Sequence, residues 1–442
     1  MEISQTIKEI EPKQEIHNFD EISLGFSEKE AIKEASRCLN CVNSPCVKGC
    51  PINNRIPEFI GMIKSQKYDD AYNVLISKSP FPEICSRVCN SEEQCMKNCT
   101  RGIKENPIRI NLLERFVCDK VSRNKIEKTD NNKIKVAIIG GGPSGMTVAK
   151  ILAIDGYDIT IYEANNNVGG VLTYGIPNFR LPKNIVENEI ENLKQLDVKI
   201  ITNKKINSYK GLLSDYDYIY IAIGAWKPKL MGIEGETLDG VYDANKFLFE
   251  VNSDIDKIKN KIENKNVVII GGGNVAMDAA RCAIRLNANS VNIYYRRTEK
   301  EMPANNDELR QAKQEGVNII ELVLPKQIIG ENNKVKSIKC VRTKLSDEDE
   351  SGRRKPIEIE GSEFRNDVDV VIEAINSNVD TNLLDGILLN KNGNIIVNEK
   401  GKTNITKIYA GGDVVTGPAT VIGAVKAGID ASTTIKEETI WQ

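Results

Sequence analysis

The chain has 442 residues, with 60 Lys or Arg against 62 Asp or Glu, so its formal net charge is -2. Its length corresponds to about three domains of about 150 residues, and its charge balance gives no basic field for nucleic acid or an acidic membrane. The single histidine, His17, excludes a Ser-His-Asp hydrolase, a zinc site of several histidines and most acid–base schemes that use histidine. The polar start, with no run of 18 apolar residues, leads us to expect a soluble, cytoplasmic protein.

A helix is expected ahead of the first cysteines. Ser27 followed by Glu30 forms a capping box, which predicts the start of this helix. The helix should deliver Cys38 in its last turn to the loop that follows. Its apolar stripe at four-residue spacing would be Ala31, Ala35 and Leu39.

Most of the cysteines lie in one short stretch. Eight of the 11 fall between residues 38 and 99, and in a reducing compartment such a group is expected to bind metal rather than to form disulfides. Three close cysteines followed by a fourth and a proline are typical of ferredoxin sequences, whereas zinc sites usually combine two spaced pairs. Eight thiolates suffice for two 4Fe–4S clusters. They are Cys38, Cys41, Cys46, Cys50, Cys85, Cys89, Cys95 and Cys99.

After a polar linker at 121–133, the sequence takes the pattern of a dinucleotide-binding fold. Residues 134–139 predict a strand that runs into a glycine-rich loop, a helix and a second strand ending at Glu163. The glycines let the backbone approach a pyrophosphate, the helix N-terminus faces its charge, and Glu163 can accept a hydrogen bond from a ribose hydroxyl. The loop consists of Gly140, Gly141, Gly142, Pro143, Ser144 and Gly145.

The same pattern recurs at residues 266–297, with strands expected at 266–270 and 290–295. At the end of its second strand, Tyr295 stands where the first copy has Glu163, and Arg296 and Arg297 follow. Guanidinium groups bind a 2′-phosphate that a carboxylate would repel, so this copy favours NADP(H) over NAD(H). The alternative is that the two arginines only solvate a strand edge. The loop consists of Gly271, Gly272, Gly273, Asn274, Val275 and Ala276.

Two dinucleotide folds in one chain imply two dinucleotides, and the pair that performs chemistry is FAD with NAD(P)H. The first fold, with its acid, would hold FAD. Near the C-terminus, Gly412 and Asp413 follow a predicted strand, where the carboxylate can accept a hydrogen bond from a ribityl hydroxyl. A helix that begins near Pro418 would direct its positive end at the isoalloxazine.

A disulfide reductase of this architecture carries a redox-active cysteine pair beside the flavin. Between residues 134 and 442, only Cys282 and Cys340 occur, and they are far apart in the sequence. We expect both to be buried small hydrophobic residues. Electrons should therefore leave the flavin by another route, which the N-terminal clusters offer.

Further motifs extend over nearly the whole chain: residues 24–27, 47–51, 174–177, 180–183, 295–297, 301–303 and 412–422. With the cysteine block, these resemble the small (beta) subunit family of NADPH-dependent glutamate synthase. The module is also similar to the N-terminal half of dihydropyrimidine dehydrogenase and to the larger subunit of the electron-bifurcating NADH-dependent ferredoxin:NADP oxidoreductase.

The resemblance implies which residues bind each cofactor. Cys38, Cys41, Cys46 and Cys99 would hold one 4Fe–4S cluster. Cys50, Cys89, Cys95 and Glu114 would hold the other, unless Glu114 is only a solvated carboxylate; Cys85 and Cys118 would be spare. For FAD, the residues beyond the first loop and Glu163 would be Gly170, Leu172, Arg180, Gly412, Asp413, Thr420 and Val421.

Two positions depart from the family pattern. Asn90 replaces the proline common after the matching cysteine, and Asn376 replaces the glycine of an Ala-Ile-Gly turn. Asparagine tolerates a positive φ better than most residues, so we expect the turn at Asn376 to survive.

The predicted fold class is α/β, with a helical iron–sulfur domain followed by two Rossmann-like domains. Residues 1–130 would form the helical domain with two 4Fe–4S clusters, residues 131–250 and 378–442 the FAD domain, and residues 251–377 an inserted NADPH domain. The charged run at 346–355 is expected to be an exposed hairpin tip.

The predicted function needs no acid–base residue. A hydride passes from NADPH to FAD, and single electrons leave through the clusters to a partner, expected to be a large glutamate synthase-type subunit. One alternative is the bifurcating enzyme, whose partners are a small flavoprotein subunit and ferredoxin. Another is a non-catalytic redox-sensing or electron-transfer module. Neither nucleic acid nor a membrane is expected as a partner.

Overall fold

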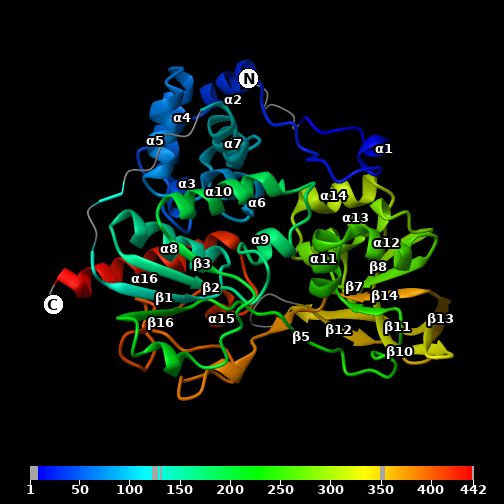
Figure 1. Cartoon of the computed structure of the whole chain (residues 1–442). Helices are drawn as coiled ribbons and strands as arrows, with labels where there is room; N and C mark the ends of the chain where they lie inside the picture. The colour runs from blue at the N-terminus through cyan, green and yellow to red at the C-terminus, as the bar shows by residue number, and fades with distance from the viewer. Residues whose placement is uncertain (1–7, 122–127, 130–131, 349–353, 441–442) are drawn as a thin grey trace.

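The computed structural model describes residues 8–121, 128–129, 132–348 and 354–440, and these form three units (Figure 1). A helical unit, at the top of Figure 1, precedes two units that are each built on a parallel sheet. No helix of the described residues is long and apolar enough to cross a bilayer.

The helical unit packs short helices around one apolar core that includes Phe59 and Leu113. The predicted capping box is confirmed, because the Ser27 backbone N–H donates to Glu30 Oε2 at 2.9 Å. The helix ends at Ser36, so the prediction that Leu39 extends its apolar stripe is wrong, and Leu39 is 53% exposed in the loop beyond. Helix α1 (Pro12–Glu15) precedes the unit and lies outside its core (Figure 1). The elements of the unit are α2 (Glu28–Ser36), α3 (Pro45–Lys48), α4 (Ile56–Lys64), α5 (Tyr68–Ile76), α6 (Pro82–Val88), η1 (Thr100–Ile103) and α7 (Ile110–Lys120).

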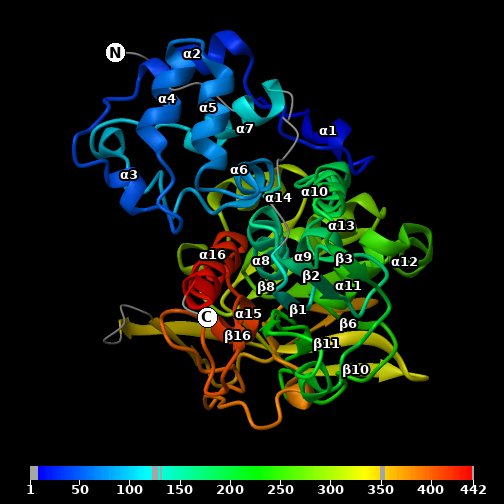
Figure 2. The same ribbon diagram turned by 60° about the vertical axis from the view of Figure 1, so that its left-hand side comes forward.

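The first sheet unit has five parallel strands in the order β16-β4-β1-β2-β3, so the last strand of the chain completes a sheet begun near residue 135. Its strands are β1 (Lys135–Ile139), β2 (Asp158–Tyr162), β3 (Lys199–Ile201), β4 (Tyr218–Ile221) and β16 (Ile408–Ala410). Its helices are α8 (Pro143–Ile154), α9 (Val171–Tyr174), α10 (Lys183–Gln195), η2 (Tyr209–Leu212), η4 (Thr381–Leu383), α15 (Asp413–Thr416) and α16 (Val421–Ile440). Helices α8 and α16 pack against each other, as Figure 2 shows.

The second sheet unit repeats this plan with the strand order β6-β14-β7-β8-β9, again all parallel. Its strands are β6 (Val241–Asp243), β7 (Asn266–Ile270), β8 (Ser290–Tyr295), β9 (Asn318–Glu321) and β14 (Val370–Glu373). Its helices are α11 (Ala244–Ser253), α12 (Ile255–Ile262), α13 (Asn274–Arg285), η3 (Glu299–Glu301) and α14 (Asn306–Gln314). Strand β6 and helix α11 belong to this unit although both begin before residue 251, where the sequence predicted the inserted domain to begin.

An antiparallel sheet extends the second unit between β9 and β14. Its strands are β10 (Val323–Glu331), β11 (Lys334–Glu348), β12 (Arg354–Glu358) and β13 (Phe364–Asp367). The β10–β11 turn contains Asn332 and Asn333, both at positive φ, which matches the twist of a two-residue hairpin. Within the charged run predicted as a hairpin tip, Glu348 pairs with Arg354, and residues 349–353 lie outside the described residues.

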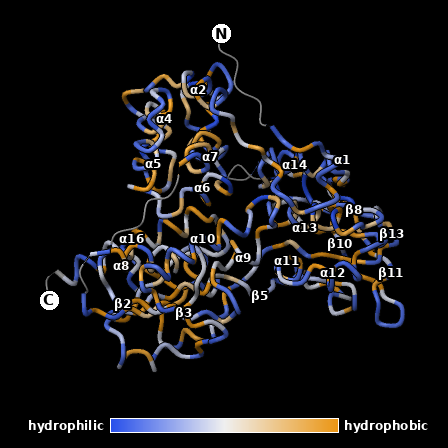
Figure 3. The backbone as a smooth tube through the Cα atoms, turned by 45° about the horizontal axis from the view of Figure 1, so that its top comes forward, coloured by the Kyte–Doolittle hydropathy of each residue, from blue (hydrophilic) through white to orange (hydrophobic). Residues whose placement is uncertain are grey.

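The chain crosses between the two sheet units twice, and the two crossing segments pair with each other. Strand β5 (Lys227–Pro228) leaves the first unit, β15 (Ser377–Asn378) returns to it, and the two form an antiparallel ribbon. The Asn245 side chain donates to Ser377 Oγ at 2.5 Å and so ties α11 to this ribbon. In Figure 3, hydrophobic residues concentrate along the strands, consistent with parallel sheets that are covered on both faces.

A buried ionic cluster joins the sheet units away from the ribbon. Arg180 of the first unit lies 2.7 Å from Asp278 Oδ2 on α13 and 2.7 Å from Glu308 Oε1 on α14. Arg281, which is fully buried, pairs with Glu308 and with Glu315 at 2.7 Å. We call these residues, with Arg285, which also pairs with Glu315, the ionic cluster.

Aromatic packing and the N-terminal segment enclose the ionic cluster. The Phe179 ring lies under the guanidinium groups of Arg281 and Arg285, at 4.6 and 4.2 Å from its centroid. The Ile22 backbone N–H donates to the Phe179 carbonyl at 3.1 Å, and Glu9 binds Arg310 of α14 at 2.7 Å. Residues 8–23 therefore fasten both sheet units from outside.

Replacing Arg281 with Met should destabilise the protein by about 3–5 kcal/mol, because Glu315 would keep a buried charge with one partner fewer. Urea unfolding measures the loss. The matched control is Lys313→Ala, which removes the exposed pair with Glu299 and should cost about 1 kcal/mol or less. Equal losses for the two variants would contradict this account of the ionic cluster.

Candidate functional site

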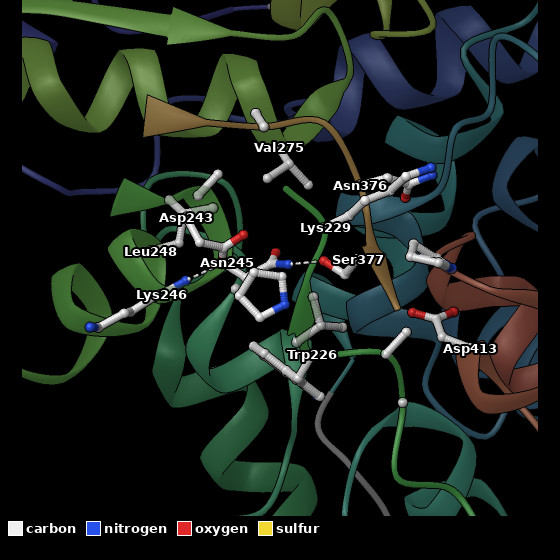
Figure 4. Close-up of a pocket in the computed structure, with 18 of the residues that line it drawn as sticks. Trp226, Lys229, Asp243, Asn245, Lys246, Leu248, Val275, Asn376, Ser377 and Asp413 are labelled. Atoms are coloured by element: carbon white, nitrogen blue, oxygen red, sulfur yellow. Dashed lines mark hydrogen bonds between the residues drawn. The ribbon is translucent and has the colours of Figure 1, made fainter. Parts of the chain in front are cut away.

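A cavity of about 1560 Å³ lies between the two sheet units and opens along the carboxyl ends of their strands. Residues 140–144 and Gly412 line it from the first unit, and residues 271–274 and Arg296 line it from the second. Figure 4 shows Trp226, Asn245 and Asp413 around this space. Carboxyl ends of parallel strands are where open α/β sheets bind ligands, and here two such edges share one cavity.

The glycines of the two loops have matching roles. Gly140 has φ +102°, and a Cβ there would lie 2.4 Å from the Ala222 carbonyl; Gly271 has φ +146°, with the Ala374 carbonyl at 2.3 Å. Gly142 and Gly273 precede the first turns of α8 and α13, and a Cβ at either would find its nearest neighbour only at 3.9 Å. Both helix N-termini are thus open to a close phosphate, which fits the residues to a dinucleotide pyrophosphate.

The residue that ends the second strand differs between the copies in a way that changes the ligand. Both oxygens of the buried Glu163 accept backbone hydrogen bonds, from Gly141 and Asn165 at 2.9 Å each, so its carboxylate is held at the cavity wall. In the second copy, the Tyr295 hydroxyl donates to the Glu301 carbonyl at 2.8 Å. No carboxylate occupies that position, and the exposed Arg296 lines the cavity next to it.

The C-terminal motif reaches the cavity from the edge of the first sheet. Asp413 Oδ1 accepts from the Ala419 backbone N–H at 3.2 Å, and burial raises the pKa of this carboxyl to about 6. Thr420 Oγ1 accepts from the Gly423 backbone N–H at 3.2 Å and caps α16, the long helix predicted to begin near Pro418. Asp413, Thr420 and the first residue of α16 all line the cavity.

Not every residue predicted to bind a cofactor faces the cavity. Arg180 lines it, but its guanidinium is held by Asp278 and Glu308, so its contacts are within the protein. Gly145 packs α8 against β1, because a Cβ there would lie 2.1 Å from the Gly140 carbonyl. Those outside the lining are Gly145, Leu172, Ala276 and Arg297, whereas Gly140, Gly142, Pro143, Ser144, Glu163, Gly170, Arg180, Gly271, Gly273, Asn274, Arg296, Gly412, Asp413, Thr420 and Val421 line it.

Leu172 contributes to the site through its backbone carbonyl, whereas its side chain does not line the cavity. Lys183 Nζ donates to the Leu172 carbonyl at 3.0 Å and to the Ile176 carbonyl at 2.5 Å. Burial lowers the pKa of Lys183 to about 8. The lysine therefore fixes the 170–176 segment, of which Gly170 and Ile176 line the cavity.

Sequence reasoning missed several residues of the cavity wall, although a signal for them exists. Trp226 follows β4, and Glu373 is the last residue of β14. Because parallel strands end at one edge, residues just after predicted strands were candidates. The expected turn at Asn376 is present, with φ +113°.

Glu373 is buried beside other carboxyl groups at this edge. Burial, together with the charge of Glu236 and a hydrogen bond to it, raises the pKa of Glu373 to about 8. Its Oε1 has no hydrogen-bond partner among the described residues. In the strand register, Glu373 lies opposite Asp243 of β6 on one side and Ile270 of β7 on the other. Ile270 is the residue directly before the second glycine loop.

Four of the cysteines surround a small cavity in the helical unit. They are the set that the resemblance assigned to one cluster: Cys38, Cys41, Cys46 and Cys99. Residues with positive φ, Asn40 and Ser44, bend the loop around it, and Cys41 Sγ lies 3.3 Å from Thr100 Oγ1. Burial raises the pKa of the Cys46 thiol to about 11, so each thiol must lose a proton when it binds metal.

The second set gathers around Glu114 on α7. Burial raises the pKa of Cys95, and the charges of Glu114 and Cys50 raise it further; burial and the charge of Glu114 likewise raise the pKa of Cys50. The charge of Glu114 also acts on Cys89, whose pKa is raised first by its hydrogen bond with Cys85. Glu114 is 9% exposed, and burial raises its own pKa well above the ordinary value, so it is not a solvated carboxylate.

A cluster and a single metal ion place different requirements on the spacing of their donors. Among the described residues, no three His, Cys, Asp or Glu side chains converge closely enough to hold one metal ion. Zinc requires four donors within about 2.3 Å of one point, whereas the thiolates of a 4Fe–4S cluster each bind a different iron and stand farther apart.

The cysteine sets and the dinucleotide cavity adjoin in series. Cys89 is flanked in sequence by Val88 and Asn90, and both of these line the dinucleotide cavity. Cys95 of the second set lies near enough to Cys46 of the first for the two thiols to interact. The order from the cavity is therefore the second set and then the first.

The chain matches two family models. Residues 15–126 match the 4Fe–4S domain II of dihydropyrimidine dehydrogenase, and residues 134–428 match pyridine nucleotide-disulphide oxidoreductases. The small chain of NADPH glutamate synthase from Escherichia coli is 33% identical over 94% of this chain and 92% of its own length. The chain belongs to the glutamate synthase small-subunit family. The predicted family is thus confirmed.

Other relatives extend this family membership. The beta subunit of the NADP(+)-dependent formate dehydrogenase from Moorella thermoacetica is 37% identical over 90% of this chain, which spans 60% of that subunit. FprA from Mycobacterium tuberculosis shares the fold, with a TM-score of 0.60 at 21% identity over 70% of this chain and 85% of FprA. The predictions of an α/β fold, of an oxidoreductase and of FAD, NADPH and 4Fe–4S cofactors are confirmed at the level of the family.

Cys99→Ala should remove one cluster and keep the other, because Cys99 lines only the cavity of the first set. We expect about four fewer irons per chain than in the wild type, measured by iron and acid-labile sulfide analysis of anaerobically prepared protein. Cys118→Ala, a matched control on α7 outside both sets, should keep the full iron content. Equal iron content in Cys99→Ala and the wild type would contradict the grouping.

Glu373→Gln should stabilise the protein at high pH. The folded pKa of Glu373 lies above its ordinary value of 4.5, so wild-type stability falls as the pH rises from 4.5 to about 8. The variant lacks this loss, and its advantage should grow by up to about 4 kcal/mol across that interval. Thermal unfolding at pH 5 and pH 8.5 measures it, with the exposed Glu360→Gln as control; a pH-independent difference would contradict the assignment.

Proposed function

We propose that the chain is an electron-input subunit that oxidises NADPH at FAD and passes single electrons through two 4Fe–4S clusters to a partner subunit. The observation that carries this proposal is the position of Cys89, a ligand candidate whose neighbours Val88 and Asn90 line the dinucleotide cavity. Flavin and cluster sites that adjoin in this way need no diffusing carrier between them.

The choice of NADPH rests on the second glycine loop. Arg296 lines the cavity next to Tyr295, which stands where the first copy has Glu163, and guanidinium favours a 2′-phosphate over a free ribose hydroxyl. The relatives agree, because the formate dehydrogenase subunit and the glutamate synthase chain are both named for NADP(+) or NADPH. The names of these relatives agree on NADP(H) and differ in the second substrate.

When bound, FAD supplies the conversion of a hydride into single electrons, and the 4Fe–4S clusters carry these onward. The residues of this chain bind and orient. Gly142 and Gly273 leave the two helix N-termini free for phosphates, and Glu163 and Asp413 present carboxylates to hydroxyl groups. Lys183 holds the segment beside the cavity in place. No proton transfer from a side chain is needed.

Electrons would leave at the first cysteine set. The loop that carries Cys38, Cys41 and Cys46 exposes two apolar side chains, Leu39 at 53% and Val42 at 99%. Apolar groups exposed beside a redox site are suited to a docking partner. We propose a large glutamate synthase-type subunit as this partner, and a co-purifying small flavoprotein would indicate the bifurcating enzyme instead.

Anaerobic addition of NADPH to FAD- and iron-loaded protein should bleach the flavin absorbance, and an unchanged spectrum would contradict the proposal.

Arg296→Ala should weaken NADPH binding about tenfold or more and leave NADH binding nearly unchanged, because only the 2′-phosphate needs the guanidinium. Titration of each nucleotide measures this difference. The control is Arg365→Ala, an exposed arginine on β13, and equal weakening of NADPH and NADH by Arg296→Ala would overturn the cofactor assignment.

A further inference from the structure

The cavity has a second basic side chain at the end where Arg296 lies. This wall is built by two strands: β8 supplies Tyr294 and Tyr295 before Arg296, and β10 supplies residues 323–326. Lys326 is therefore part of the same wall as Arg296, although thirty positions separate them in the sequence.

A break in the strand pairing singles out Lys326. In the β10–β11 ladder, Pro325 pairs with Cys340 and Gln327 with Lys339, so Lys326 is an extra residue with no partner opposite. An extra residue of this kind is a β-bulge, which redirects a side chain and is common next to binding sites. The bulge places Lys326 at the cavity in a strand that otherwise pairs regularly there.

Two contacts connect Lys326 with the backbone that carries Arg296. Lys326 Nζ donates to both oxygens of Glu358, at 3.0 and 3.2 Å. Glu358 of β12 pairs in register with Thr343 of β11, and the Thr343 hydroxyl donates to the Arg296 carbonyl at 2.9 Å. The antiparallel sheet thus holds the lysine and the arginine in one neighbourhood.

We propose that Lys326 is a second cation for the 2′-phosphate of NADPH, held ready by Glu358 while no phosphate is bound. This inference rests on the proposed function and adds a specificity residue that the second glycine loop does not contain. It also gives the antiparallel sheet of the second unit a role in choosing between NADPH and NADH.

The exchange of partners is physically favourable. Lys326 and Glu358 are 43% and 48% exposed, and ion pairs at such surfaces contribute little. A phosphate monoester carries more charge than a carboxylate and offers three acceptor oxygens, so the ammonium group should prefer it. Glu358 would then return to solvent at little cost, because it is already half exposed.

The test uses 2′,5′-ADP, which has the 2′-phosphate without the nicotinamide, and 5′-AMP, which lacks that phosphate. Isothermal titration of the full chain gives both affinities with no need for turnover. Lys326→Ala should weaken 2′,5′-ADP about tenfold through loss of a charge-assisted contact and leave 5′-AMP unchanged. The matched control is Lys339→Ala, an exposed lysine on β11 opposite Gln327, which should change neither ligand.

Glu358→Gln tests the holding role separately. Without the carboxylate, Lys326 is free for the phosphate, so 2′,5′-ADP should bind a few-fold more tightly than to the wild type. Wild-type affinity for 2′,5′-ADP in both Lys326→Ala and Glu358→Gln would overturn this inference and leave the proposed function standing. Failure of the wild type to bind 2′,5′-ADP or NADPH at all would overturn the proposed function, and this inference with it.

Discussion

The geometry of the shared cavity depends on the ionic cluster around Arg180 and Arg281. The two glycine loops belong to different sheets, and only the contacts between the sheet units determine that both loops open onto one space. Removing one partner from a buried ion pair leaves an uncompensated charge, so the residues of the ionic cluster depend on one another. The cluster favours one relative position of the units, the one in which Arg180 reaches both α13 and α14.

In the helical unit, the spacing of the cysteines in the sequence determines how close the two sets lie. The unit's two cysteine sets are interleaved in sequence, since Cys46 and Cys50 are four positions apart but were assigned to different sets. Alternation of this kind brings the two sets close together without a long connecting segment. Glu114, presented by α7 from within the core, lies close enough to the cysteines of the set nearer the cavity for its charge to act on them.

Sequence patterns located the sheets closely because strand and glycine loop reinforce each other. Residues 266–270 and 290–295 were predicted as strands, and β7 and β8 have these bounds. Strand β6 has three residues, too few for a periodicity that would mark it in the sequence as part of the second unit. Arg180 carried no local signal of its partners, because Asp278 lies far along the chain and only folding brings it close.

The position of Cys89 has a consequence for the rate of electron transfer. Its backbone is bonded directly to two residues of the cavity wall, so the protein part of a path from this wall to the Cys89 sulfur consists of a few covalent bonds. Thermal motion of the units can change the distance between their packed surfaces, but it does not lengthen a covalent peptide bond. The part of a tunnelling path that runs from this wall to the Cys89 sulfur would therefore keep the same number of bonds while the rest of the molecule fluctuates.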